Sequence, residues 1–227
     1  MKKLLHSSKI FKNGFTLAEV LITLVIIGVV AALTIPTVIN TYVESSTVAK
    51  VKKGISILGQ AKKLAEAQNG SIEGWDFGEG SSEETATKFW NYIKPYISVT
   101  KDCGASGDCY QSDGFYKLNG SLYSSENINN LPNYYKVILA DGSLIWFRTG
   151  ESGKCATSQG GLQNICVLVG HDVNGAKKPN TVGKDIFVYH INVDGVFPAL
   201  QNDCRKNSDG WGCATYIVKN SNMNYLH

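Results

Sequence analysis

The chain has 227 residues, enough for one domain of ordinary size and an appendage. Its 22 basic and 19 acidic residues give a net charge of +3. The first fourteen residues contain no acid and four of the lysines, namely Lys2, Lys3, Lys9 and Lys12. The remaining 18 basic and 19 acidic residues nearly cancel, which excludes a nucleic-acid-binding surface based on a general basic charge, and we predict no nucleic-acid partner.

An apolar run covers residues 15–35, directly after this basic leader. Its 21 residues span about 31 Å as a helix, close to the ~30 Å hydrocarbon core of a bilayer. Lysines precede the run and none follows it immediately, so we expect a cytoplasmic N-terminus and an extracytoplasmic remainder. A cleaved secretory signal would have a shorter apolar stretch, and here the A-x-A-like site, Val30-Ala31-Ala32, lies inside the run. The pattern therefore favours a retained membrane-spanning helix.

Two residues in this region are unusual for a membrane span. Glu19 lies near the start of the run, where a charge is costly and usually faces a partner inside a helix bundle. The alternative is a glutamate that extends to the lipid–water interface. Pro36, at the end of the run, lacks a backbone N–H and predicts a kink or a locally melted segment.

The stretch "GFTLAEVLITLVIIGVVAALTIP" resembles the N-terminal signature of the type IV pilin-like family, which includes pilins and the pseudopilins of type II secretion. The matching features are Gly14, the aromatic Phe15, Glu19 fifth from Phe15, the apolar run and Pro36. The signature covers about a tenth of the chain. Many family members have a basic residue just before the glycine, whereas this chain has Asn13.

The resemblance implies a processing route and a set of partners. A membrane prepilin peptidase would cut between Gly14 and Phe15 and methylate the new amine of Phe15. Glu19 would dock onto the amine of Phe15 in a neighbouring pilin-like subunit. An inner-membrane assembly platform and the lipid bilayer are the other implied partners. The cut would also remove the leader lysines, which hold this end of the helix at the anionic lipid surface.

A second helical stretch follows over residues 37–70. Apolar residues recur at three- and four-residue spacing from Val38 to Ala65, lysines occupy the other face, and Asn69-Gly70 is a plausible end. We therefore expect one helix of roughly fifty residues, from Phe15 to Gln68.

Residues 71–227 predict a globular head. A capping box from Ser81 to Glu84 predicts a helix over 81–97, bent at Pro95. Strands are expected in 134–148, which contains the hairpin signal Asp141-Gly142, and in 164–172 and 185–198. Residues 117–132 read as a surface loop. The fold class is therefore α+β, with a long N-terminal helix packed on a small antiparallel sheet, as the resemblance also implies. We divide the chain into a basic leader (1–14), a membrane and filament-core helix (15–36), the second half of the helix (37–70) and the head (71–227).

Six cysteines follow residue 100 as three close pairs, none with zinc-site spacing. In an exported segment they predict disulfides, and free buried cysteines are the alternative. Six cysteines allow 15 connectivities, so three local bridges are one possibility among several. The resemblance implies a bridge near the C-terminus. The candidates are Cys103, Cys109, Cys155, Cys166, Cys204 and Cys213.

The loop over residues 172–185 is the one stretch of the head with possible ligand chemistry. Asp172, Asn174, Asn180 and Asp185 offer the oxygen ligands that calcium prefers, although Lys177 and Lys178 lie among them and the loop departs from an EF-hand. The alternative is a structured connection whose side chains cap backbone amides. Calcium is therefore a possible ligand, and we expect no other cofactor.

The sequence predicts a structural subunit and no enzyme, because no nucleophile, metal or phosphate motif is found. The expected protein is cleaved and N-methylated, is anchored in a bacterial inner membrane, and assembles into a type II secretion pseudopilus or a type IV pilus. The alternative is a membrane-anchored extracytoplasmic enzyme or binding protein whose span only mimics the signature.

Overall fold

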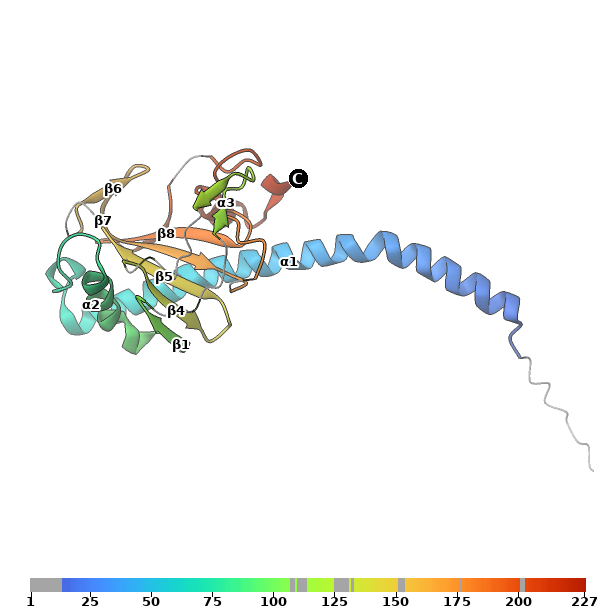
Figure 1. The fold of residues 1–227 in the computed structure, drawn as a ribbon, viewed down its shortest axis with the longest axis horizontal. Coiled ribbons are helices and arrows are strands. Elements are labelled where there is room, and N and C mark those ends of the chain that lie inside the picture. Colours follow the sequence, from blue (N-terminus) through green and yellow to red (C-terminus); the bar gives the residue numbers. More distant parts are fainter. Residues whose placement is uncertain are drawn as a thin grey trace, which may run out of the picture. The chain divides into compact units, whose positions relative to one another are not determined.

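The structure is a computed structural model that describes residues 14–106, 109, 114–124, 131, 133–150, 154–175, 177–200 and 203–227. It divides into two units, Met1–Val43 and Glu44–His227. The long helix α1 covers Leu17–Asn69, so the predicted fifty-residue helix is confirmed and the boundary between the units falls within it (Figure 1). It is helical throughout and includes Pro36, so no melted segment is present there. The leader falls outside the described residues except for Gly14.

The second unit is built around an antiparallel sheet with the strand order β1-β4-β5-β7-β8-β9. Strand β6 pairs with the N-terminal part of β7. The strands are β1 (Val99–Gly104), β4 (Tyr135–Leu139), β5 (Leu144–Thr149), β6 (Thr157–Gln159), β7 (Leu162–Asp172), β8 (Ile186–Asn192) and β9 (Val196–Pro198). Asp141-Gly142 turns the chain from β4 to β5, as predicted, and Gly142 has a positive φ of 80°. The α+β class is thus confirmed.

The main core lies between one face of this sheet and the helices. The C-terminal half of α1 contributes Val51, Leu58 and Ala61, all buried against inward-facing residues of β5, β7 and β8. These positions are spaced at helical intervals, so one stripe of α1 meets the sheet. Figure 1 shows α1 and α2 on the same side of the strands.

Helix α2 covers Glu83–Ile93 and is followed by a 3-10 turn, η2 (Lys94–Tyr96), which contains Pro95. The predicted capping box was placed one residue too early. The N-cap is Ser82, whose Oγ accepts from Thr85 N at 3.2 Å, while Thr85 Oγ1 accepts from Ser82 N at 3.0 Å. A threonine hydroxyl therefore takes the place that a glutamate fills in the usual box.

The other face of the sheet is covered by short elements that the sequence did not predict. Strand β3 (Leu122–Ser124) lies within residues 117–132, which were predicted as a loop, and it pairs with β2 (Phe115–Tyr116) just before that region. Helix α3 (Cys213–Asn220) and two 3-10 turns, η1 (Ile72–Gly74) and η4 (Asn224–Leu226), contribute to the main core instead, through Ile72, Ile217 and Tyr225. A second, smaller core of Leu144, Trp146, Val182 and Ile186 lies on this outer face.

Candidate assembly helix and head sites

The start of α1 is organised by a reciprocal pair between Thr16 and Glu19. Thr16 N and Thr16 Oγ1 both donate to Glu19 Oε2 at 2.8 Å, and Glu19 N donates to Thr16 Oγ1 at 3.2 Å. This is a complete capping box, in which two backbone N–H groups that the helix leaves open are satisfied. Within a single subunit the Glu19 carboxylate is therefore not bare. The T-x-x-E spacing of Thr16 and Glu19 is the sequence pattern of such a box, and it was not among the predicted features.

The first unit leaves its large apolar side chains exposed. Phe15 is 88% exposed, and most of the large side chains between Leu17 and Val43 are more than half exposed. The window of highest hydropathy in α1 averages 2.6 and has no buried residue, and α1 is the one described helix that is long and apolar enough to cross a membrane. An apolar surface of this extent indicates contact with lipid or with other helices.

Threonine hydroxyls along this stretch bond back to the helix. Thr23 Oγ1 donates to Val20 O, Thr34 Oγ1 to Val30 O and Thr41 Oγ1 to Thr37 O, at 2.9–3.0 Å. Each hydroxyl proton is therefore satisfied within the helix. This matters in lipid, where no water is available to accept it.

The second half of α1 is fixed to the sheet by polar contacts as well as by packing. Lys50 Nζ donates to Val173 O at 2.7 Å, and Lys53 Nζ lies 2.8 Å from Asp141 Oδ2. The pKa of the Asp141 carboxyl is lowered well below its usual range because hydrogen bonds from Lys53 and Ser143 outweigh the effect of its partial burial. These contacts join α1 to the β4–β5 turn and to the end of β7.

His171 and His190 lie on opposite faces of the sheet and do not form a common site. His171 is on the α1 side, where its Nδ1 lies 2.9 Å from the Tyr189 hydroxyl. Burial lowers the pKa of His171 to about 4. His190 is on the outer face and bonds through Nε2 to Gln159 Oε1 at 3.1 Å. No group of three or more metal-ligating side chains occurs among the described residues.

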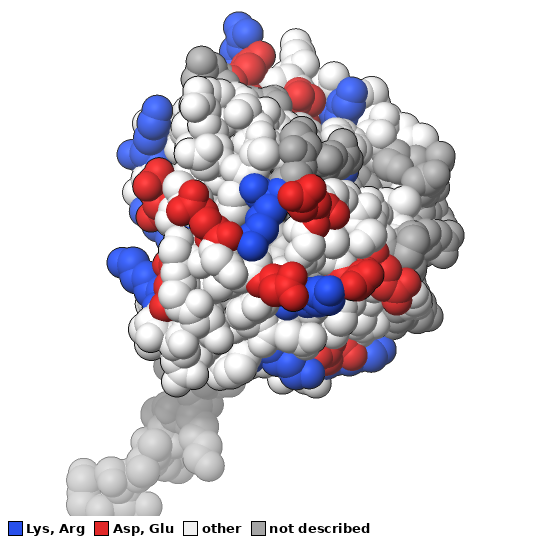
Figure 2. All heavy atoms as spheres, turned by 90° about the vertical axis from the view of Figure 1, so that its left-hand side faces the viewer, with Lys and Arg blue, Asp and Glu red and all other residues white. Residues whose placement is uncertain are grey.

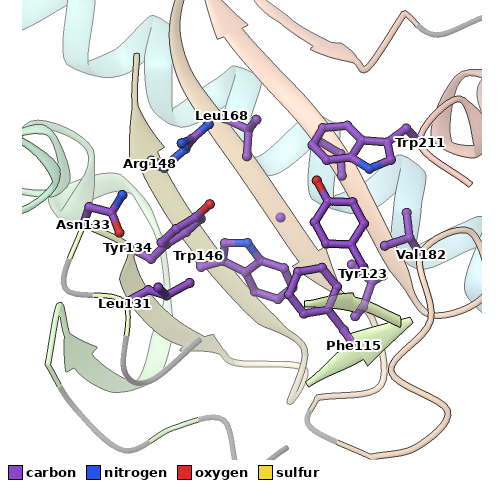
Figure 3. Close-up of a pocket in the computed structure, with 13 residues that line it drawn as sticks. Phe115, Tyr123, Leu131, Asn133, Tyr134, Trp146, Arg148, Leu168, Val182 and Trp211 are labelled. Carbon is purple, nitrogen blue, oxygen red and sulfur yellow. The ribbon is translucent and has the colours of Figure 1, made fainter. Parts of the chain in front are cut away.

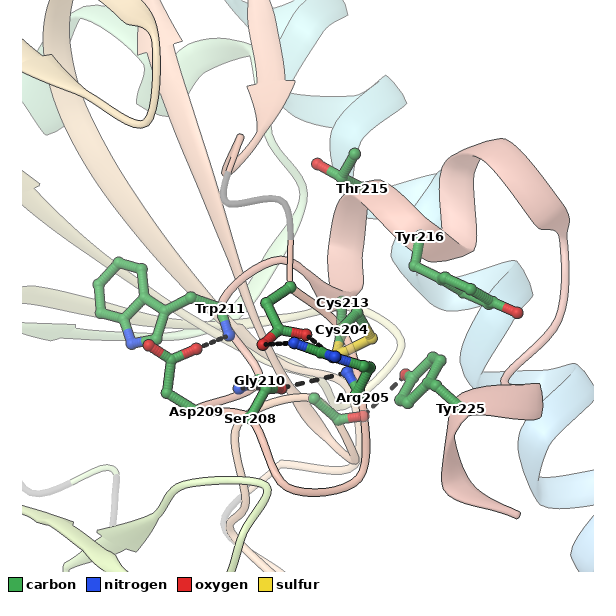
Figure 4. The surroundings of a disulfide bond; sticks show 12 residues. Cys204, Arg205, Ser208, Asp209, Gly210, Trp211, Cys213, Thr215, Tyr216 and Tyr225 are labelled. Atoms are coloured by element: carbon green, nitrogen blue, oxygen red, sulfur yellow. Dashed lines mark hydrogen bonds and ion pairs between the residues drawn. A yellow bond between two sulfur atoms is a disulfide. The ribbon is translucent and has the colours of Figure 1, made fainter.

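The six cysteines pair in sequence order, Cys103 with Cys109, Cys155 with Cys166 and Cys204 with Cys213, so three local bridges are present. The last one joins the start of α3 to the preceding loop, which Figure 4 shows packed around the bridge. Ser208 Oγ organises this loop, because it accepts from Arg205 N at 3.3 Å and from Gly210 N at 3.2 Å. Next to this loop, the Tyr225 hydroxyl donates to Gly183 O at 2.8 Å.

The four predicted calcium ligands come together around Asp185. Its Oδ2 accepts from Asn180 N at 2.9 Å and from Asn174 Nδ2 at 3.0 Å, and its Oδ1 accepts from Thr181 N at 2.6 Å. Asp172 Oδ1 accepts from Asn174 N at 3.1 Å. Both oxygens of the central carboxylate therefore already face N–H donors, which is the arrangement of a closed connection. The calcium site stays a prediction.

Lys136 is a buried residue that the sequence analysis missed. It is fully buried, and its Nζ donates to Ala105 O and to Leu131 O. Burial lowers its pKa to about 8. It points to the outer side of β4, opposite the neighbouring Val137 in the main core. The sequence does not indicate this burial, because a lysine in a strand is expected to face solvent.

The structure gives no uniformly basic surface on the face that Figure 2 draws. Its described acidic and basic side chains are interspersed, as expected for a head of nearly balanced charge.

Comparison with known proteins places one part of the chain. Residues 11–35 match the family model of the prokaryotic N-terminal methylation motif. No curated protein and no solved structure shows significant similarity to the chain. The match covers Gly14, Phe15, Glu19 and the apolar run, which are among the features that carried the resemblance, and it ends just before Pro36. The chain therefore carries the N-terminal signature of the type IV pilin and pseudopilin family, whose members are structural proteins.

Proposed function

We propose that the chain is a prepilin-like structural subunit that assembles, after processing, into a type II secretion pseudopilus or a type IV pilus. A prepilin peptidase cuts between Gly14 and Phe15 and methylates the Phe15 amine. The observation that carries the proposal is an apolar stretch of α1 without a buried residue, with Glu19 in the first turn of the helix and inside the methylation motif. An extracytoplasmic enzyme or binding protein with an ordinary anchor has no need of a carboxylate at that position.

The subunit waits in the inner membrane with its N-terminus in the cytoplasm and its head outside. The leader lysines favour this orientation, because positive residues stay on the cytoplasmic side. During assembly the apolar helices leave lipid for a bundle, where Glu19 pairs with the Phe15 amine of a neighbour. Opposite charges attract strongly in such a setting, and an unpaired one is penalised, so the pair selects the register.

Mass spectrometry of the mature N-terminus tests the processing step. We expect the membrane-extracted chain, expressed together with a prepilin peptidase, to begin at Phe15 and to carry one methyl group on its amine. Replacing Gly14 with Ala should leave the leader in place, because the peptidase needs the glycine of the signature. A chain that still begins at residue 1 beside an active peptidase would contradict this step.

Two substitutions of Glu19 separate docking from helix capping. Glu19→Gln keeps a side chain that completes a capping box with Thr16, whereas Glu19→Ala loses both the cap and the charge. We expect both variants to insert into the membrane and neither to enter filaments, as scored by shearing and cross-linking. Filaments that form normally with Gln but not with Ala would mean that Glu19 only caps the helix. Normal assembly of both would contradict the proposed docking.

A further inference from the structure

Two adjoining hollows lie on the face of the sheet that points away from α1. Strand pairing brings Arg148, Leu168 and His190 into one row across β5, β7 and β8. The next row along the same face consists of Trp146, Gly170 and Val188. Arg148 and Leu168 line both hollows, so the large one and the small one adjoin at these two side chains.

The large hollow is lined mainly by aromatic side chains. It has a volume of about 410 Å³, within the range of pockets that hold small ligands. Figure 3 shows the rings of its wall, which come from β2, β3, the segment before β4, β5 and the C-terminal loop. They are Phe115, Tyr123, Tyr134, Trp146 and Trp211.

One wall of this hollow is a flat aromatic surface. Trp146 lies directly against the backbone of β7 at Gly170, where an added Cβ would be 2.0 Å from Trp146 Cε2. Only glycine at this position allows the indole to lie so close to the strand. The ring is thereby held against the strand, and since it is only 4% exposed, Tyr123, at 38%, offers the more accessible ring of the hollow.

The small hollow has a volume of about 80 Å³, and Thr157, Gln159 and His190 are among the side chains that line it. His190 is only 1% exposed there, and burial lowers its pKa to about 4, so it is neutral at physiological pH. Because its Nε2 faces Gln159 Oε1, Nε2 carries the proton and Nδ1 is left as an acceptor. That Nδ1 and the nearby Thr157 Oγ1 are buried and have no hydrogen-bond partner in the described part of the chain.

We infer that this site binds the ring of a neutral carbohydrate. His190 Nδ1 requires a donor from the ligand, and the Thr157 hydroxyl can donate or accept. Sugar hydroxyls donate and accept, whereas a carboxylate group can only accept and an aliphatic chain can do neither. The C–H face of a sugar ring packs on the electron-rich face of an aromatic ring. The large hollow therefore takes the ring, and the small hollow takes its hydroxyl groups.

The test is a titration of the full chain with four neutral disaccharides: maltose, cellobiose, lactose and N,N′-diacetylchitobiose. The chain is kept in a phosphocholine detergent, because a maltoside head group would itself be a ligand. Binding is read by saturation-transfer NMR and by tryptophan emission, which reports Trp146 and Trp211. Concentrations up to about 50 mM detect affinities as weak as about 10 mM. We expect saturable binding of at least one disaccharide.

Matched variants place the binding in this site. Tyr123→Ala removes a ring from the wall, and Tyr116→Ala removes a similarly exposed tyrosine of the neighbouring strand that does not line it. We expect Tyr123→Ala to weaken binding about tenfold, the effect of one aromatic contact worth ~1.4 kcal/mol. Tyr116→Ala should leave it unchanged. Thr157→Val, which keeps the shape but loses the hydroxyl, should weaken it as well.

Three results would overturn the inference. The first is the absence of saturable binding for all four disaccharides. The second is saturable binding of N-acetyltryptophanamide, lost in Tyr123→Ala, without binding of any disaccharide, which would make this a pocket for an aromatic side chain of a partner protein. The third is an equal loss of disaccharide binding in Tyr116→Ala and Tyr123→Ala, which would place the ligand elsewhere.

Discussion

Gly54 and Gly59 are both glycines inside α1, but a methyl group meets different surroundings at the two positions. At Gly54 an added Cβ would lie 2.7 Å from His171 Nδ1, and at Gly59 it would meet nothing within 4 Å. Gly54 is thus the place where the helix approaches the sheet through a buried histidine. Gly59 has no such role.

We predict that alanine substitutions at these two glycines change the free energy of unfolding in opposite directions. Gly59→Ala should raise the free energy of unfolding of the head by about 1 kcal/mol, since alanine is the better helix former. Gly54→Ala should lower it despite the same gain, because overpacking a core costs ~1–3 kcal/mol and displaces the His171–Tyr189 contact. Denaturant unfolding of both variants measures the difference. A stabilised Gly54→Ala variant would show that α1 does not approach His171 in this way.

His171 also predicts how stability depends on pH. Its pKa falls from 6.5 to about 4 on folding, chiefly by burial, with Lys50 and Lys53 adding and Asp141 opposing. The unfolded chain therefore binds the proton more readily between these values, and the stability present above pH 6.5 is lost as the pH falls toward 4. Each buried histidine contributes up to ~1.4 kcal/mol per pH unit in this window.

The comparison of slopes tests this contribution. His190 has a similar shift, so His171→Gln should remove about half of the slope of unfolding free energy between pH 6 and pH 5. The measurement is a set of denaturant melts at several pH values. It is a difference in slope, so a variant of lower absolute stability still answers the question. Parallel slopes for the two proteins would contradict a neutral buried His171.

At the scale of elements, the start of α2 shows how two adjacent serines differ. Ser82 Oγ accepts from the N–H of Thr85 within the helix, whereas Ser81 Oγ accepts from Asn133 Nδ2 at 3.2 Å. Ser82→Ala should therefore cost about 1 kcal/mol of stability as the loss of a cap, and Ser81→Ala should cost less. Thermal unfolding of the two variants measures this. A larger cost at Ser81 would mean that Ser81 is the N-cap, as the sequence predicted.

The connection from β7 to β8 gives a prediction about metal removal. Because both oxygens of Asp185 accept N–H groups, we expect excess chelator to leave the melting temperature unchanged. Asp185→Asn should lower the stability by ~1–3 kcal/mol, since an amide cannot accept all of these hydrogen bonds. A fall in melting temperature with chelator, reversed by calcium, would instead establish the predicted calcium site.

For the whole molecule, stability of the second unit depends on three short covalent loops. The bridged cysteines are 6, 11 and 9 residues apart. Loops of this size contribute about 2–3 kcal/mol each in the chain-entropy account, and together they are comparable with the ~5–15 kcal/mol that stabilises a typical domain. Reduction should therefore lower the melting temperature strongly. The control is a thiol titration, and six free thiols with an unchanged melting temperature would contradict the expected dependence.

Much of this architecture was predictable because it follows from local patterns. The spacing of apolar residues predicted α1, and Asp141-Gly142 predicted the central hairpin. The signature that contains Glu19 indicated the assembly helix. These features depend on neighbours in sequence, which is the information that a single sequence contains.

The features that the sequence analysis missed are set by contacts between distant segments. The short strands β2 and β3 are stabilised by covering Trp146 on the outer face, and nothing in their own composition requires pairing. The aromatic rings of the large hollow come from five separate parts of the chain, and the small hollow depends on the register of β7 against both neighbours. Such arrangements arise only when the sheet is assembled, so local propensity does not encode them.

The Thr16–Glu19 pair has a consequence for how a subunit leaves a filament. Under the proposed docking, Glu19 exchanges two donors of its own chain for the amine of another, so attachment replaces one set of partners by a second set. A departing subunit can return its carboxylate to Thr16 and re-enter lipid without an unpartnered charge. The barrier to release is lower than the cost of a bare carboxylate in hydrocarbon would suggest. The proposed docking would therefore let a subunit detach from a fibre by the same exchange of partners through which it attaches.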